Sequence, residues 1–201
     1  MSSEETHRVR LLRLASARPI RPRDLAVAGI PRVYLKRLCD RGELEQVDRG
    51  LYQLAGQDVS ELHTLAQVAV RVPHGVICLL SALQAHELTT ELPHAVWVMI
   101  AKSSWTPKVN SPKLEIVRAS GAAWTYGVVE REIDGVTVKL TTPTKTVADC
   151  FRYRRHVGLE VALQALRDYL GKRVGTVDEL LEAAKADRVY RLMKPYMEAM
   201  V

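Results

Sequence analysis

The sequence of 201 residues has few of the features that define disulfide-rich proteins and metalloproteins. Its three cysteines, Cys39, Cys78 and Cys150, are an odd number, lie far apart and form no CxxC pair. This pattern excludes a disulfide framework and a cysteine-based zinc site, and it predicts that each thiol is a small buried apolar group. The six histidines are scattered without the spacing of metal ligands, so we expect neither a bound metal nor another cofactor.

Long apolar segments are absent as well. The first ten residues, MSSEETHRVR, contain no apolar run of the kind that a secretory signal requires, and no window has the length that crosses a bilayer. Internal repeats and low-complexity segments are also absent. A chain of this length forms one or two domains, which we expect in a reducing cytoplasm and away from membranes.

The motifs of common enzyme classes are missing too. There is no P-loop, no GxGxxG after a strand, no GxSxG and no HExxH. A metal-dependent DNA-cleaving domain would need clustered carboxylates beside a lysine. Glu130, Glu132 and Asp134 cluster on an expected hairpin, but no ExK sequence accompanies them. We therefore expect no catalytic residues, and keep DNA cleavage as the less favoured alternative.

The sequence does have an excess of basic residues, which is unevenly distributed along the chain. The net charge is +6 and the calculated pI is 9.3. Residues 1–56 carry 11 Lys and Arg against 7 Asp and Glu, whereas residues 57–201 carry 18 against 16. The excess per residue is thus concentrated in the first quarter of the chain, which favours an anionic partner there.

Residues 30–54 carry the pattern of the second half of a winged helix-turn-helix. A short helix over 31–41 would begin with Pro31 at its first position, turn Leu35 and Leu38 toward a core and stop at Gly42. The apolar runs 44–47 and 51–54 are separated by Asp48-Arg49-Gly50, a loop length and composition typical of a hairpin.

The preceding residues supply the first half of this motif. An amphipathic helix is expected over 4–15, and a short helix over 22–28 is broken by Gly29 just before the third helix. Residues 1–56 are therefore expected to form a DNA-binding domain with helix 31–41 in the major groove. The candidate DNA-contacting residues are Arg21, Arg23, Arg32, Val33, Lys36, Arg37 and Arg49.

The candidate residues differ in the part of DNA that they could contact and in the role that they would have without DNA. Arg32, Lys36 and Arg37 can reach guanine edges or phosphates, and Val33 can touch a thymine methyl, although the same residues could form a solvated helix face. Arg21 and Arg23 stand near a helix N-terminus, where phosphates are commonly bound. Arg49 could enter a minor groove or be a simple turn residue.

Residues 57–201 are expected to form a second, mixed domain, so the fold class is α+β. An apolar run on each side of Asp134-Gly135 is a strong hairpin signal, and Thr142-Pro143 is a typical helix start. The expected elements are helix 59–72, a strand or helix start at 76–80, helix 82–88 capped by Ser81, strands 96–101, 114–118, 128–133 and 136–140, and helices 143–155, 159–170, 177–186 and 188–200.

One cluster in the second domain is a candidate interaction site. Asp149 and Arg152 are three residues apart on a helix, so we favour a surface ion pair, while Arg152, Arg154 and Arg155 could instead face a protein partner, RNA or DNA. Lys145 lies in the first helical turn, where the helix dipole disfavours a cation. A bound anion would relieve that conflict, and an exposed, screened lysine would explain it equally well.

Several segments together resemble the AbiEi-type antitoxins, over about residues 25–184. The family pattern has a small residue or Gly where His86-Glu87 stands here. The matching segments are Gly29-Ile30-Pro31, Arg37-Leu38, Arg41-Gly42-Glu43-Leu44 and Arg49-Gly50-Leu51-Tyr52 in the first domain, and Ser81-Ala82-Leu83, Thr142-Pro143, Lys145-Thr146-Val147-Ala148-Asp149, Gly158-Leu159 and Ala162-Leu163 in the second.

The resemblance implies an antitoxin that counters a nucleotidyltransferase toxin of the AbiEii type and represses its own operon by binding inverted repeats in the promoter. Binding of inverted repeats requires two copies of the protein on one site. No coiled-coil seam is evident in the sequence, so we expect a monomer or a dimer that forms on DNA. A solitary winged-helix regulator without a toxin is the main alternative.

Overall fold

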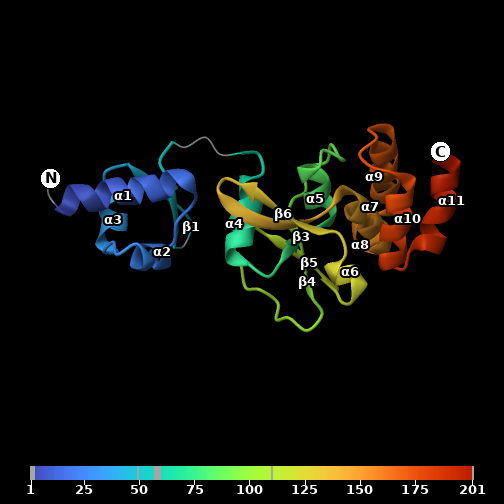
Figure 1. Cartoon of the computed structure of the whole chain (residues 1–201), viewed down its shortest axis with the longest axis horizontal. Coiled ribbons are helices and arrows are strands. Elements are labelled where there is room, and N and C mark those ends of the chain that lie inside the picture. Colours follow the sequence, from blue (N-terminus) through green and yellow to red (C-terminus); the bar gives the residue numbers. More distant parts are fainter. Residues whose placement is uncertain (1–2, 49, 57–59, 110, 201) are drawn as a thin grey trace. The chain divides into compact units, whose positions relative to one another are not determined.

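A computed structural model of the chain describes residues 3–48, 50–56, 60–109 and 111–200. The chain divides into two compact units. Unit 1 comprises residues 1–63 with 132–136, and unit 2 comprises residues 64–131 and 137–201. The α+β class is confirmed, with a winged helix-turn-helix in unit 1 and a mixed sheet with helices in unit 2 (Figure 1).

Unit 1 has the expected helix order followed by a hairpin. Its elements are α1 (Ser3–Ala17), α2 (Pro22–Val27), α3 (Val33–Asp40), β1 (Leu44–Asp48) and β2 (Leu51–Leu54). The strands β1 and β2 are antiparallel. The connector before α2 joins this wing by a single antiparallel β-bridge, in which Ile20 and Tyr52 exchange backbone hydrogen bonds of 2.8 and 2.9 Å.

The turn between α2 and α3 depends on Gly29. Its φ of +67° is left-handed, which glycine adopts at little cost, and it lets the Ile30 N–H donate to the carbonyl of Leu25 over 2.8 Å. The third helix begins two residues later than expected, so the prediction that Pro31 is its first residue was wrong. Pro31 lies in the turn, where its carbonyl accepts the N–H of Tyr34.

The core of unit 1 is formed by one face of each helix. Leu35 and Leu38 of α3 are buried, as their spacing predicts, and Gly42 after the helix has the expected left-handed φ of +69°. The buried side chains of this core are Leu11, Ala15, Ile20, Leu25, Ile30, Tyr34, Leu35, Leu38 and Leu44.

Unit 2 contains a five-stranded sheet in the order β5-β4-β3-β7-β6. Strands β4 and β5 are parallel, β3 is antiparallel to β4, and β3 is parallel to β7. The strands are β3 (Val76–Ile77), β4 (Val96–Ala101), β5 (Leu114–Ala119), β6 (Val128–Ile133) and β7 (Val136–Thr141). The expected hairpin joined by Asp134-Gly135 is therefore confirmed.

The helices of unit 2 pack around α7, which contacts α5, α9, α10 and α11. Figure 1 shows α7, α9, α10 and α11 gathered in one group. No described helix is long and apolar enough to cross a membrane. The helices are α4 (His63–Arg71), α5 (Leu79–Ala85), α6 (Ala122–Thr125), α7 (Pro143–Arg152), α8 (Arg154–Val157), α9 (Leu159–Gly171), α10 (Val177–Ala186) and α11 (Tyr190–Met200).

The start of α5 corrects one prediction. The apolar run at 76–80 is a two-residue strand that leads directly into the helix, so Ser81 is inside α5 and is not its N-cap. Its hydroxyl instead accepts the backbone N–H of Trp97 over 3.0 Å, which ties α5 to β4. Leu79, the first helical residue, has a φ of +48°, a conformation that no local signal predicts for leucine.

Other boundaries also differ from the predictions. The helix expected over 143–155 ends at Arg152 and is followed by the separate turn α8, whereas α6 was not predicted at all. The helix expected over 59–72 begins later, at His63. Val59 lies outside the described residues. Cys78 and Cys150 are buried as expected, but Cys39 is only partly buried.

Candidate DNA-binding surface and buried lysine network

The first candidate site is the outward face of α3. Arg32, Val33, Lys36 and Arg37 are all exposed, and Val33 retains 51% of its accessible surface. The guanidinium of Arg37 lies over the ring of Tyr34, 5.5 Å from its centroid, which restricts its orientation. This face thus combines three cations with one apolar side chain, the composition that reads base edges and phosphates in a major groove.

Two arginines of α1 hold this helix-turn-helix in place. Arg8 forms an ion pair of 2.6 Å with Glu43, just beyond the end of α3. Arg10 donates from Nη2 to the carbonyl of Ala28 over 2.8 Å, in the turn that precedes α3. The segments that flank α3 are therefore tied to α1, which limits the backbone freedom that would be lost on binding a partner.

The start of α2 positions the remaining described DNA candidates. The Arg21 N–H donates to Oδ2 of Asp24 over 2.7 Å, and Arg18 forms an ion pair of 3.2 Å with the same carboxylate. Burial raises the pKa of Asp24, but the Arg21 and Arg18 hydrogen bonds outweigh it, so this pKa lies below its usual value. Arg23 is exposed and Arg21 is partly exposed, whereas Arg49 lies outside the described residues.

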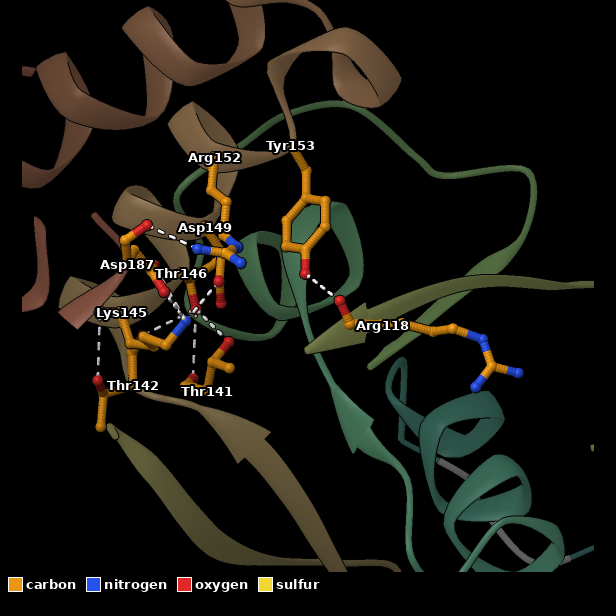
Figure 2. A network of polar contacts seen from close by, with 9 residues as sticks. All are labelled: Arg118, Thr141, Thr142, Lys145, Thr146, Asp149, Arg152, Tyr153 and Asp187. Atoms are coloured by element: carbon orange, nitrogen blue, oxygen red, sulfur yellow. Dashed lines mark hydrogen bonds and ion pairs between the residues drawn. The ribbon is translucent and has the colours of Figure 1, made fainter. Parts of the chain in front are cut away.

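The second candidate site is a buried charge network in unit 2. Lys145 has 0% of its surface exposed, and its Nζ donates to Asp187 over 2.8 and 3.0 Å and, by a short contact, to Asp149. Figure 2 shows the ammonium between the two carboxylates. The interpretation of Lys145 as an exposed lysine was therefore wrong, and so was the surface ion pair between Asp149 and Arg152.

Arg152 has a different partner from the one expected. Its Nη1 donates to the backbone carbonyl of Asp187 over 2.7 Å, so α7 holds Asp187 at both its side chain and its main chain (Figure 2). Asp187 is the C-cap of α10. Asp187 carries no sequence signal of this role, because no local pattern connects it with a lysine 42 residues earlier.

Three ionisable groups in a dry interior determine the protonation of this network. Burial raises the pKa of Asp149 to about 8; Lys145 opposes this shift and Asp187 adds to it. Burial lowers the pKa of Lys145, but the two carboxylates outweigh it and the pKa is raised. The Asp149 carboxyl is therefore mostly protonated at neutral pH, beside the Lys145 ammonium. Oδ2 of Asp149 has no hydrogen-bond partner within the described part of the chain.

The N-terminus of α7 is organised by threonines, as predicted. Thr142 caps the helix by accepting the Lys145 N–H over 3.3 Å, with Pro143 as the first helical residue. Thr146 donates to the Thr142 carbonyl over 2.7 Å and lies 2.7 Å from the hydroxyl of Thr141. The Lys145 ammonium already has Asp149 and Asp187 as partners, so no bound anion is needed to explain its position.

The remaining residues of the second candidate cluster are separated from the network. Arg155 is exposed on α8, and Arg154 is partly exposed and donates to the carbonyl of Phe151 over 3.0 Å. Only these two arginines of the original cluster, with part of Arg152, have surface that a macromolecule could contact. The side chains of Lys145 and Asp149 support the fold around them instead.

Comparison with known proteins agrees with this architecture. Residues 8–55 match a family model described as "Transcriptional regulator, AbiEi antitoxin". The crystal structure of the RV2827C protein from Mycobacterium tuberculosis is similar in fold, with a TM-score of 0.59, 13% sequence identity, and coverage of 96% of this chain and 81% of that chain. No curated protein matches the chain. The resemblance seen in the sequence is thus confirmed for the winged helix.

Proposed function

Because residues 8–55 match the AbiEi antitoxin transcriptional regulators, we propose that this protein binds its own promoter and represses it. The observation that carries the proposal is the exposed face of α3, with Arg32, Lys36 and Arg37 around Val33 and the opposite face held in the core. Helix α3 enters the major groove, and the wing with Arg49 lies on flanking backbone. Arg21 and Arg23 contact phosphate.

The second part of the proposal assigns residues 1–56 to DNA binding and residues 57–201 to antitoxin action in the cytoplasm, without catalysis. The partner is a nucleotidyltransferase toxin, and the partly exposed Arg154 with the exposed Arg155 forms the cationic surface that would face it. Support comes from the antitoxin-like segments in the second domain. Two copies bind an inverted repeat, as monomers in solution or as a dimer that forms on the DNA.

The test of DNA binding compares the upstream DNA of the gene with a scrambled duplex of the same composition, across a salt series. A preference of about a thousandfold or more is expected for a specific regulator. Arg32→Ala combined with Arg37→Ala should remove that preference, while Arg13→Ala, a change of another exposed arginine in unit 1, should retain it. Equal affinities for both duplexes would reject the regulator.

The solitary regulator is distinguished by a second experiment. The neighbouring gene of the operon is expressed in bacteria with and without this chain, and growth is measured. Rescue of growth by the full chain supports the antitoxin. Promoter repression without any rescue would leave the solitary winged-helix regulator as the correct interpretation.

A further inference from the structure

Trp105 is the most exposed of the large apolar side chains that the structure describes, with 96% of its surface accessible. It lies between β4 and β5, and the fold makes no use of its indole. Of the other two tryptophans, Trp97 is buried and Trp124 is partly buried. Leaving an indole in water forgoes the stabilisation that burial provides, so an exposed tryptophan requires an explanation other than folding.

The backbone that carries Trp105 is held in place by Arg118. Its Nη1 donates to the Ser104 carbonyl over 2.7 Å and its Nη2 to the Thr106 hydroxyl over 2.9 Å. Both neighbours of the tryptophan are thus bound by one guanidinium. The carbonyl of Arg118 in turn accepts the hydroxyl of Tyr153 over 2.8 Å (Figure 2). The indole is therefore presented from fixed backbone, which lowers the entropy lost on binding.

A cavity of about 400 Å³ lies beside the indole within unit 2. Val72, Ile100 and Pro107 contribute apolar surface to it, and Arg71 and His74 line it as well. No Asp or Glu side chain is among its described lining residues. One planar ring of the size of a nucleobase fits a cavity of this volume, with the indole as one wall.

The segment around the tryptophan is cationic. Residues 102–113 contain Lys102, Lys108 and Lys113 and neither Asp nor Glu. Lys113 lies 3.5 Å from Glu115, while Lys102 and Lys108 are exposed. An exposed aromatic face next to the exposed cations Lys102 and Lys108 is the combination that binds single-stranded nucleic acid by stacking and phosphate contact. A protein partner would be recognised by the indole alone, and would not require these two cations.

We propose that this surface binds single-stranded nucleic acid, with one base stacked on Trp105 in the cavity and phosphates on Lys102 and Lys108. The site is independent of the α3 surface, since all of its residues belong to unit 2. It gives the protein a second nucleic-acid contact of a different kind, for unpaired bases instead of a duplex groove.

The test uses the full chain carrying Arg32→Ala, Lys36→Ala and Arg37→Ala, so that α3 does not contribute. Labelled RNA and DNA single strands of about 12 nucleotides and mixed sequence are the probes. Trp105→Ala should weaken binding about tenfold or more, and Trp105→Phe, which retains an aromatic face, should recover most of it. The matched control is Leu92→Ala, another apolar side chain of unit 2 that is 83% exposed, which should have no effect.

The salt dependence separates stacking from charge. Lys102→Gln with Lys108→Gln should lower the slope of log affinity against log salt by about 1.4, whereas Trp105→Ala should leave that slope unchanged. Equal affinity of the Trp105→Ala variant and its parent would overturn the proposal. It would also be overturned if Trp105→Ala affected only binding to a purified protein partner. Comparison of the RNA and DNA probes shows which strand is preferred.

Discussion

The ammonium of Lys145 lies 2.8 Å from Oδ1 of Asp187, a residue 42 positions farther along the chain. The pair is fully buried, and the side chain of Asp149 completes it. A buried ion pair of this kind contributes little beyond what apolar packing would provide, but removing one partner leaves an uncompensated charge in a dry interior. The first prediction follows from that asymmetry.

Lys145→Met is expected to lower the free energy of unfolding by about 3–5 kcal/mol, because two carboxyl groups lose their cation. Urea denaturation measures the change. Lys185→Met is the matched control, since Lys185 forms an exposed pair with Glu182 and should leave the free energy of unfolding essentially unchanged. Equal losses for both variants would show that burial of the network has no energetic consequence.

The pH dependence of stability should carry the signature of Asp149. Its pKa is raised from 3.8 to about 8 in the folded protein, so the folded state binds the extra proton between these values. Stability from this group is fully present below about pH 4 and is lost as the pH rises through about 8. Asp149→Asn is neutral at every pH, so its stability relative to the parent should increase from about pH 5 to 8 and level off above about 9.

Unfolding free energies at about pH 5, 6.5, 8 and 9 test this prediction, with the wild-type chain measured in parallel. Glu182→Gln, on the exposed side of α10, serves as the control and should follow the parent at all four values. A difference between Asp149→Asn and the parent that stays constant with pH would contradict the protonation assigned to Asp149.

Gly127 is expected to be intolerant of a side chain. Its φ is +62°, and a Cβ there would lie 2.7 Å from Cβ of Lys145, while its carbonyl accepts the Thr142 N–H. Gly42 has a similar φ of +69°, but a Cβ added there would meet no atom within 4 Å. Both alanine variants share the cost of a left-handed residue, about 1–2 kcal/mol, and Gly127→Ala should lose about 1–3 kcal/mol more through the clash. Thermal unfolding of the two variants gives this difference directly.

Glu87, in the His86-Glu87 segment where a small residue or glycine was expected, has a left-handed φ of +57°. Glu87→Gly should therefore raise stability by about 0.5–1 kcal/mol, because glycine adopts this conformation without steric cost. Gln84→Gly, inside α5, should do the opposite and cost about 1 kcal/mol. A loss of stability for both glycine variants would mean that the Glu87 side chain makes a contribution larger than its backbone strain.

Arg37→Ala should reduce discrimination between the promoter and altered sequences by about 1–3 kcal/mol if this guanidinium reads a guanine. Its position over Tyr34 favours one defined orientation. Lys36→Gln should weaken binding to all sequences alike and lower the salt slope by about 0.9. The measurement is a competition assay with single base-pair changes, and a uniform loss for Arg37→Ala would reassign it to phosphate contact.

Short sequence patterns correctly predicted the helices and turns that are determined by residues close together in the chain. Helix α10 has the expected bounds because Thr176 caps it and Glu179 returns a hydrogen bond to the Thr176 N–H. The Asp134-Gly135 turn places β6 and β7 for a similar reason.

The incorrect predictions concern features that depend on residues far apart in the chain, or on a backbone conformation that the residue type does not indicate. Lys145 is buried because Asp187 and Asp149 meet it, and Asp187 is too distant for helical spacing to reveal. The early start of α5 depends on a left-handed Leu79. On the recognition helix, by contrast, helical spacing was enough to separate buried Leu35 and Leu38 from exposed Lys36.

The ion pair between Lys145 and Asp187 also affects the order in which the two units can fold during synthesis. During synthesis, the winged helix is complete once about 55 residues have left the ribosome, and N-terminal domains generally fold first. The core around α7 cannot close until residue 187 has followed, because Lys145 and Asp149 would otherwise be buried without their third partner. A nascent chain thus completes its winged helix well before the core around α7 can form.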